Sequence, residues 1–284
     1  MNHPKSIKLF LMDGEPNGRW ACELSNLTGK AYKIPRIRVR DSSDREDLNN
    51  TGVYLLFGKD DNDNEMVYIG EAESILKRLN QQISQQDFWT EAVVFISKDD
   101  NLNKAHVKYI ENRLFEIASS AKRYKIENSV TPTQSTISES DRAEMEEFIE
   151  NMKLMVNTLG HKVFEQKVLQ GSIGKSVFKI KAARGADAKG QPTSEGFVVF
   201  KGSKVASSIV ESMTKSFVSM RERLIEKGVI VKNGDTYEIP EDYIFTSPST
   251  AAVMVLGRNV NGLTEWKLAD GRTLKEYEST SSQT

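Results

Sequence analysis

The first 130 residues alternate between apolar and polar positions over short stretches, a pattern that indicates β-strands. Residues 6–24 contain two apolar runs around a turn of Gly, Pro and Asn residues, which is typical of a β-hairpin. The stretch KIPRIRVR then alternates strictly, so Arg36, Arg38 and Arg40 would lie on one face of a further strand. We therefore expect residues 1–48 to form a small β-unit that packs on the domain after it.

Residues 49–130 combine strand and helix periodicities. Short apolar runs separated by a polar turn predict paired strands, and apolar residues spaced three or four apart predict amphipathic helices. The expected elements are strands at 52–58, 66–70 and 91–97 and helices at 75–83 and 103–121. This order predicts a small domain with a three-stranded sheet flanked by helices.

The charge of the chain changes sign in its second half. A helical pattern begins with an acidic part, and from Glu139 to Glu150 there are six acidic residues and one arginine. From Lys162 to Lys204 there are nine Lys or Arg residues and three Asp or Glu residues, a net charge of +6. We expect 131–175 to be a linker with an acidic helix and 176–284 to be a second α+β domain. The whole chain is therefore predicted to be of the α/β (α+β) class.

Composition and overall charge narrow the possible classes of protein. The 284 residues are 38% hydrophobic and 28% charged, which is enough apolar material for packed cores. The net charge of −1 gives no overall bias towards nucleic acid, so such binding would have to come from local basic patches. Cys22 is the only cysteine, which favours a reducing, cytoplasmic location. No apolar run is long enough for a signal peptide or a membrane span.

Four polar side chains are spaced so that they can meet at the rim of the predicted domain. Tyr54 and Tyr68 lie opposite the apolar faces of their strands, so strand pairing can bring both phenols to one surface. Arg78 flanks the apolar stripe of the next helix, and Glu111 lies at the edge of the stripe of the later helix. A carboxylate can hold a hard divalent cation, a guanidinium can bind phosphate with a planar fork, and a nearby cation favours the charged form of a tyrosine. These groups suit the hydrolysis of a phosphodiester.

The motifs GVY and YIG, which contain Tyr54 and Tyr68, resemble the paired motif of GIY-YIG endonucleases. That family has an arginine ten residues after the second motif tyrosine, which corresponds to Arg78. Its metal-binding glutamate lies on a later helix in a pattern like YIENRL, which corresponds to Glu111. Many members also have an asparagine after that helix in a P-x-N context. Asn128 in KIENS is the candidate here, and no proline precedes it.

The resemblance covers about residues 51–130 and implies a metal-dependent endonuclease that hydrolyses DNA. It implies that Tyr54 activates water and that Tyr68 orients water or phosphate. Arg78 would stabilise charge on the transferring phosphate, and Asn128 would belong to the same catalytic set. Glu111 would hold Mg²⁺ or Mn²⁺, and no small-molecule cofactor is expected.

The flanks of this region, residues 1–45 and 176–280, resemble those of a GIY-YIG subgroup whose C-terminal domain has no settled function. The basic stretch 162–204 and the C-terminal domain would supply binding or target choice. Further nucleic-acid contacts are expected from Arg36, Arg38, Arg40 and Lys77. Such spaced charges can follow a phosphate backbone without recognising its sequence. For the arginine stripe, a solvated edge strand protected from aggregation by its charge is an equal alternative.

Two other functions fit the same patterns. The chain could be a non-catalytic nucleic-acid-binding or regulatory protein that retains the GIY-YIG fold. The C-terminal domain and the acidic helix could also form a protein-interaction module. The presence of Tyr54, Tyr68, Arg78 and Glu111 together favours the enzyme, and the slightly negative overall charge favours the other two.

Overall fold

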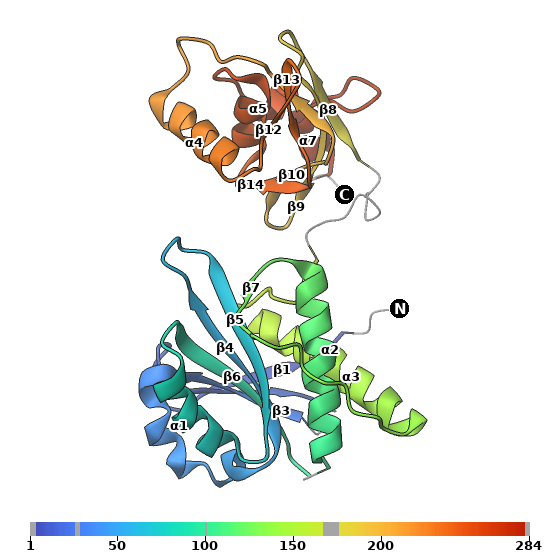
Figure 1. Cartoon of the computed structure of the whole chain (residues 1–284). Helices are drawn as coiled ribbons and strands as arrows, with labels where there is room; N and C mark the ends of the chain where they lie inside the picture. Colours follow the sequence, from blue (N-terminus) through green and yellow to red (C-terminus); the bar gives the residue numbers. More distant parts are fainter. Residues whose placement is uncertain (1–3, 26–28, 100, 167–175, 282–284) are drawn as a thin grey trace. The chain divides into compact units, whose positions relative to one another are not determined.

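The computed structural model describes residues 4–25, 29–99, 101–166 and 176–281. The chain divides into two compact units, residues 1–166 and 167–284 (Figure 1). Each unit contains a mixed or antiparallel sheet and several helices, so the predicted α/β (α+β) class is confirmed. No helix among the described residues is both long enough and apolar enough to cross a membrane.

One seven-stranded sheet forms the centre of the first unit. Its strands follow the spatial order β1-β2-β3-β6-β4-β5-β7, and all neighbours are antiparallel except β5 and β7. The strands are β1 (Ile7–Leu11), β2 (Trp20–Leu24), β3 (Gly29–Pro35), β4 (Gly52–Lys59), β5 (Glu65–Ala72), β6 (Trp89–Ser97) and β7 (Lys125–Ile126). Because β3 pairs with β6, the N-terminal hairpin and the strands of the predicted nuclease-like region belong to the same sheet.

Helices cover both faces of this sheet. On one face lie α1 (Ile75–Gln85) and the 3₁₀ segments η1 (Arg36–Arg38), η2 (Arg40–Asp44) and η3 (Glu46–Asn49). On the other face lie α2 (Lys104–Ala121) and the acidic helix α3 (Glu139–Thr158) (Figure 1). This double cover explains why β4 and β6 are nearly continuous apolar runs, since a strand that is buried on both faces does not alternate.

Residues 36–40 do not extend a strand, so the predicted arginine stripe is wrong. β3 ends at Pro35, which lacks the N–H that continued pairing would need, and two 3₁₀ segments follow. Val39 is fully buried whereas Ile37 is 86% exposed, although a strand would place both on one face. The alternation of the sequence therefore reflects a turn with one inward residue and not a pleated strand.

The second unit has its own sheet and its own core. The strand order is β12-β13-β11-β9-β10-β14, and β8 pairs with β9. The strands are β8 (Phe178–Lys181), β9 (Asp187–Thr193), β10 (Gly196–Val199), β11 (Ser203–Val205), β12 (Val231–Asn233), β13 (Thr236–Ile239) and β14 (Tyr243–Phe245). The helices are α4 (Lys215–Glu226), α5 (Pro248–Leu256), α6 (Gly262–Glu265) and α7 (Leu274–Ser281).

The core of the second unit forms around α5. Residues 251–256 of this helix are all buried, as expected for a helix that is apolar on every side. The fully buried ring of Trp266 packs against Phe197, with ring centroids 4.5 Å apart. Asn233 pairs with Thr236, so Gly234 and Asp235 form the two-residue turn between β12 and β13, and Gly234 has a φ of +60° at its first position.

Candidate active site

Both motif tyrosines lie on the face of the sheet that α1 covers. The strand register places Tyr54 opposite Gly70 and Leu56 opposite Tyr68, so the two phenols are diagonal neighbours. Their ring centroids are 6.0 Å apart and the ring planes meet at 25°. Tyr54 is fully buried and Tyr68 is partly exposed. The structure therefore brings together the two side chains that the sequence motif singles out.

The glycines of the two motifs create the space for this arrangement. A Cβ atom on Gly70 would lie 2.4 Å from both Cζ and Oη of Tyr54, so only a glycine leaves room for that ring. A Cβ atom on Gly52 would lie 2.3 Å from the carbonyl oxygen of Phe95 on the neighbouring strand β6. The glycine of the YIG motif is thus required by the ring of Tyr54, and the glycine of the GVY motif is required by the backbone of the neighbouring strand.

Two side chains of α1 hold the hydroxyl of Tyr54. Nε of Arg78 donates to Tyr54 Oη at 3.2 Å, and Nε2 of Gln82 donates to the same oxygen at 2.9 Å. Gln82 was not predicted, since a glutamine within a helical pattern has no distinguishing signal. The other amide atom of Gln82, Oε1, is buried and has no hydrogen-bond partner among the described residues.

The ionisation of Tyr54 differs from the expectation. Burial raises the pKa of Tyr54 above its ordinary value, and the neighbouring Tyr68 adds to the rise. The hydrogen bond and positive charge of Arg78 lower this pKa, but by less than burial raises it. A neighbouring cation was predicted to favour the phenolate, and in the folded protein burial outweighs it.

Glu111 on α2 has a second carboxylate, Glu71, as its neighbour. Burial and the negative charge of Glu71 raise the pKa of Glu111 to about 7, against smaller opposing effects of Arg78 and Lys108. A main-chain hydrogen bond from Glu71 to Glu111 also opposes the rise. Glu71 was not predicted, although it follows the YIG motif and lies on the same face of β5 as the buried residues Val67 and Ile69. Two repelling carboxylates of this kind would bind a cation favourably.

An open cleft of about 390 Å³ lies beside these groups. It is lined by Glu71, Ala72, Glu73, Ser74, Lys77, Arg78, Gln81 and Lys104. Arg78 therefore reaches the cleft and Tyr54 at once, and Lys77 is at the cleft as a nucleic-acid contact would require. Lys104 is paired with Glu73 at 2.9 Å. The cleft thus combines two cationic side chains that can bind phosphate with a carboxylate that can bind a metal.

The donor set fits a small hard cation. No group of three or more potential His, Cys, Asp or Glu ligands occurs in the part of the chain that the structure describes. Mg²⁺ commonly takes only one or two protein carboxylates and completes its octahedron with water and substrate phosphate. Glu111 and Glu71 together match that requirement.

The side chain of Asn128, which was predicted to belong to the catalytic set, is bonded to the main chain of β5. Its Oδ1 accepts from the N–H of Ile69 at 3.0 Å, and its Nδ2 donates to the carbonyl of Ile69 at 2.7 Å. Both polar atoms of the side chain are therefore bonded to the main chain of β5, just past the end of its pairing with β7. We conclude that Asn128 holds the strand that carries Tyr68 and Gly70, and that its contacts are with protein backbone.

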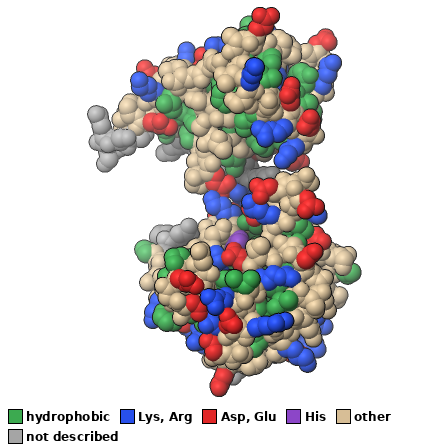
Figure 2. Space-filling model, turned by 90° about the vertical axis from the view of Figure 1, so that its left-hand side faces the viewer, with side chains coloured by type: hydrophobic (Ala, Val, Ile, Leu, Met, Phe, Trp, Pro, Cys, Tyr) green, Lys and Arg blue, Asp and Glu red, His purple; other side chains and the backbone are tan. Residues whose placement is uncertain are grey.

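The three N-terminal arginines do not form one phosphate-binding row. Arg36 donates to the carbonyls of Gln86 at 2.7 Å and Ile83 at 2.8 Å, so it caps the end of α1. Arg38 is paired with Asp41 at 3.1 Å and Glu15 at 3.5 Å. Basic and acidic side chains are mixed on this face of the first unit (Figure 2). The strand face on which Arg36, Arg38 and Arg40 were expected to line up is therefore absent, and their contacts with nucleic acid stay a prediction.

Comparison with known proteins informs only the second unit. A family model described as a domain of unknown function (DUF4357) matches residues 178–278, from β8 into α7. No curated protein and no solved structure matches the chain.

Proposed function

We propose that the first unit is a metal-dependent endonuclease of the GIY-YIG type that hydrolyses phosphodiester bonds in DNA. The resemblance of its motifs supports this proposal. The observation that carries it is the position of Arg78, which binds Tyr54 through Nε and lines the cleft shared with Lys77 and Glu71. A chain that only needed a stable sheet would have no reason to direct these charges to one cleft.

Each side chain has a task that follows from its surroundings. The bond from Nε of Arg78 to Tyr54 fixes the guanidinium plane, and the terminal nitrogens of Arg78 then bind phosphate oxygens and stabilise their growing charge. Because burial favours the neutral phenol, we assign Tyr54 the task of holding Arg78. Tyr68 is the partly exposed phenol and would orient the attacking water.

Glu111 and Glu71 would hold Mg²⁺ or Mn²⁺. When bound, the metal would polarise the phosphate and stabilise the leaving oxygen. Lys77 would bind a phosphate next to the one that is cleaved, since it lines the same cleft as Arg78.

A plasmid-nicking assay with and without Mg²⁺ tests the proposal. Arg78→Ala should lower the nicking rate about 10²–10³-fold, the usual cost of removing one group that stabilises a transition state electrostatically. Arg38→Ala is the matched control, since Arg38 is an arginine of the same unit that does not line the cleft. Nicking that is absent in the unmodified protein, or equal in the two variants, would favour a non-catalytic nucleic-acid-binding role.

A further inference from the structure

Three lysines of the second unit lie side by side, two on adjacent strands and one on a segment bridged to them. Lys179 on β8 is the register partner of Lys189 on β9. On its other side Lys179 exchanges two main-chain hydrogen bonds with Lys267, at 2.7 and 3.0 Å. All three side chains are exposed and lie on the face of the sheet opposite the core. We call this set, Lys267, Lys179 and Lys189, the lysine row.

The neighbouring row on the same face has a different charge pattern. Two residues further along the strands, Lys181 faces Asp187, and Asp187 faces Lys204. Lys204 in turn faces Glu238 on β13, so the charges alternate in sign along this row. Lys181 and Asp187 form an ion pair at 3.6 Å. Charges in this row therefore compensate one another within the protein.

The lysine row has only indirect compensation, since the charge of Lys267 helps to lower the pKa of Glu276 without forming an ion pair with it. Among the described residues, no carboxylate lies within ion-pair distance of Lys179, Lys189 or Lys267. Like charges directly opposite each other destabilise a sheet. Two strand spacings cover about 10 Å, which is close to the Debye screening length of about 8 Å at physiological ionic strength. Salt therefore screens the repulsion between the three ammonium groups only in part. The arrangement costs stability unless an anion neutralises it.

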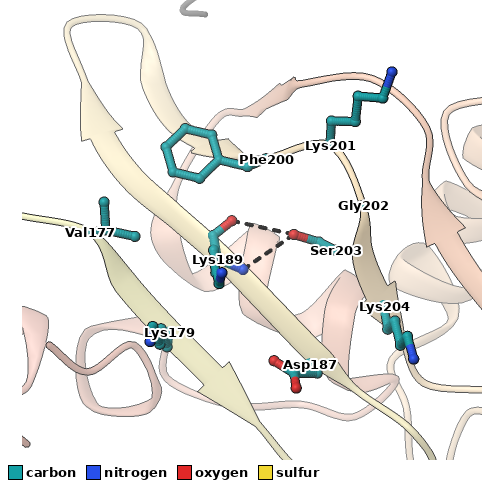
Figure 3. Close-up of a pocket in the computed structure, with 9 residues that line it drawn as sticks. All are labelled: Val177, Lys179, Asp187, Lys189, Phe200, Lys201, Gly202, Ser203 and Lys204. Atoms are coloured by element: carbon teal, nitrogen blue, oxygen red, sulfur yellow. Dashed lines mark hydrogen bonds between the residues drawn. The ribbon is translucent and has the colours of Figure 1, made fainter. Parts of the chain in front are cut away.

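A cavity of about 490 Å³ adjoins the row. Lys179, Lys189 and Lys204 line it from three neighbouring strands, and Lys201 lies on the turn beside them (Figure 3). Hydrogen bonds between the hydroxyl of Ser203 and the main chain of Lys189 hold β9 and β11 together beneath it. Lys179, Lys189 and Lys204 thus project from paired strands, and two main-chain hydrogen bonds to Lys179 fix Lys267 beside β8.

We propose that the lysine row binds the phosphate backbone of DNA without recognising its sequence. A line of charges across three chain segments matches a linear polyanion better than a single phosphate group. Lysines act as point charges, and the row has no planar guanidinium fork for one terminal phosphate. Phe200, the aromatic residue of the cavity, is only 3% exposed, so its ring is not accessible for stacking on a base. Contacts with phosphates alone place DNA without reading it.

The proposal is independent of the nuclease assignment, because it concerns binding by the second unit. The full chain is titrated into a labelled DNA duplex of arbitrary sequence in EDTA, so that cleavage does not interfere. The test variant replaces all three lysines of the row by glutamine: Lys179→Gln, Lys189→Gln and Lys267→Gln. The matched control replaces three other exposed lysines of the same unit and changes the net charge equally: Lys215→Gln, Lys227→Gln and Lys275→Gln.

We expect the row variant to bind DNA at least tenfold more weakly than the control at 100 mM salt. Each lost phosphate contact lowers the salt dependence by about 0.9 for duplex DNA, so the slope of log affinity against log salt should flatten by about 2–3. Equal affinities and equal slopes for the two variants would overturn the proposal. Thermal melting by circular dichroism checks that both variants fold.

Competition experiments distinguish DNA from other anions. Unlabelled DNA should displace the probe at far lower phosphate concentration than ATP or inorganic phosphate. Displacement by ATP at an equal phosphate concentration would indicate a site for a free phosphate, and equally efficient displacement by polyglutamate would indicate an acidic protein partner. Either result would overturn the assignment. At saturating DNA the row variant and the control variant should nick plasmid at the same rate in Mg²⁺, so a loss of binding by the lysine row is distinguishable from a failure of the proposed nuclease.

Discussion

At the scale of single residues, the candidate active site depends on a buried phenol and two neighbouring carboxylates. Tyr54 has no exposure to solvent, and Arg78 and Gln82 both donate to its oxygen. Glu111 is held next to Glu71, so its negative charge is unfavourable without a cation. The hydroxyl of Tyr54 therefore has its hydrogen-bond donors within the protein, whereas the pair of Glu111 and Glu71 would be stabilised by a bound cation.

Replacing Glu111 by glutamine tests the second part. Glu111→Gln keeps the size of the side chain but removes the charge that would hold a metal, so nicking should fall at least about 10²–10³-fold. DNA affinity in EDTA should stay unchanged. The thermal midpoint should stay the same or rise, because the buried charge and its repulsion by Glu71 disappear. Nicking rate, DNA affinity and melting temperature are measured on the same preparation.

Glu116→Gln on the same helix is the control for that substitution, since Glu116 is half exposed and its one ion pair with a described residue is with Arg113, across one turn. It should change the melting temperature little and nicking not at all. Full nicking by Glu111→Gln would contradict the metal assignment and with it the proposed mechanism.

The sequence predicted the position of single side chains correctly where the period of a strand alone decides to which face of the sheet they point. Tyr54 and Tyr68 could be placed on one face because strand side chains alternate with a period of two. The sequence could not identify Glu71 or Gln82, because their importance comes from neighbours that are distant in the chain. It also gave the wrong direction for the pKa of Tyr54, since burial in three dimensions outweighs the nearby cation.

At the scale of elements, the position of α1 decides where Arg78 lies. Arg36 of the N-terminal segment binds the C-terminal end of this helix, where it donates to two carbonyls that have no partner within the helix. Its guanidinium also stacks on the ring of Trp89, 4.5 Å from the ring centroid. The sequence predicted α1 and its apolar stripe correctly, because Ile75 and Leu79 share a helical face. It failed at residues 36–40, where an alternating pattern coincides with a proline that ends pairing.

Arg36→Ala should therefore destabilise the first unit by about 2–3 kcal/mol, since it removes charge-assisted hydrogen bonds to partly buried carbonyls. Arg38→Ala should cost less than about 0.5 kcal/mol, because its partners are exposed. Urea unfolding followed by circular dichroism gives both values. Similar costs for the two variants would mean that Arg36 does not cap α1.

The loop of the N-terminal hairpin should give the first unit a measurable dependence on pH. Hydrogen bonds from the side chain of Arg19 lower the pKa of Asp13 to about 2 from an ordinary value of 3.8. A lowered folded-state pKa contributes stability above the ordinary pKa, and this contribution is lost as the pH falls towards the folded value. Asp13→Asn should thus be less stable than the unmodified protein at pH 7.

The same comparison is repeated between pH 5 and pH 3 by urea unfolding. The difference in free energy of unfolding between the unmodified protein and Asp13→Asn should stay constant down to about pH 4 and become smaller below it. A difference that does not change with pH would show that the hairpin is held by the shape of the loop and not by the charge of Asp13.

At the scale of the whole molecule, the proposed chemistry and the proposed DNA-binding surface belong to different units. The core clusters of residues 1–166 contain β1–β7 and α1–α3, and the core cluster of residues 167–284 contains strands and helices from β8 onwards. The reversal of charge along the sequence indicated such a division. The sequence also predicted that residues 1–48 pack on the domain after them, but not that their strands join its sheet, because β3–β6 pairing connects segments far apart in the chain.

A fragment of residues 1–166 should therefore fold and keep its chemistry while it loses affinity. Its melting midpoint should match one of the transitions of the full chain, because its core clusters are complete. At saturating DNA its nicking rate should equal that of the full chain, whereas its KM should rise at least tenfold at 100 mM salt because the lysine row is missing. The lysine-row variant of the full chain should show the same rise in KM with the same kcat. A fragment that nicks with an unchanged KM would mean that DNA is bound by the first unit alone, and a fragment that folds but has a lower kcat would mean that the second unit acts in the chemical step.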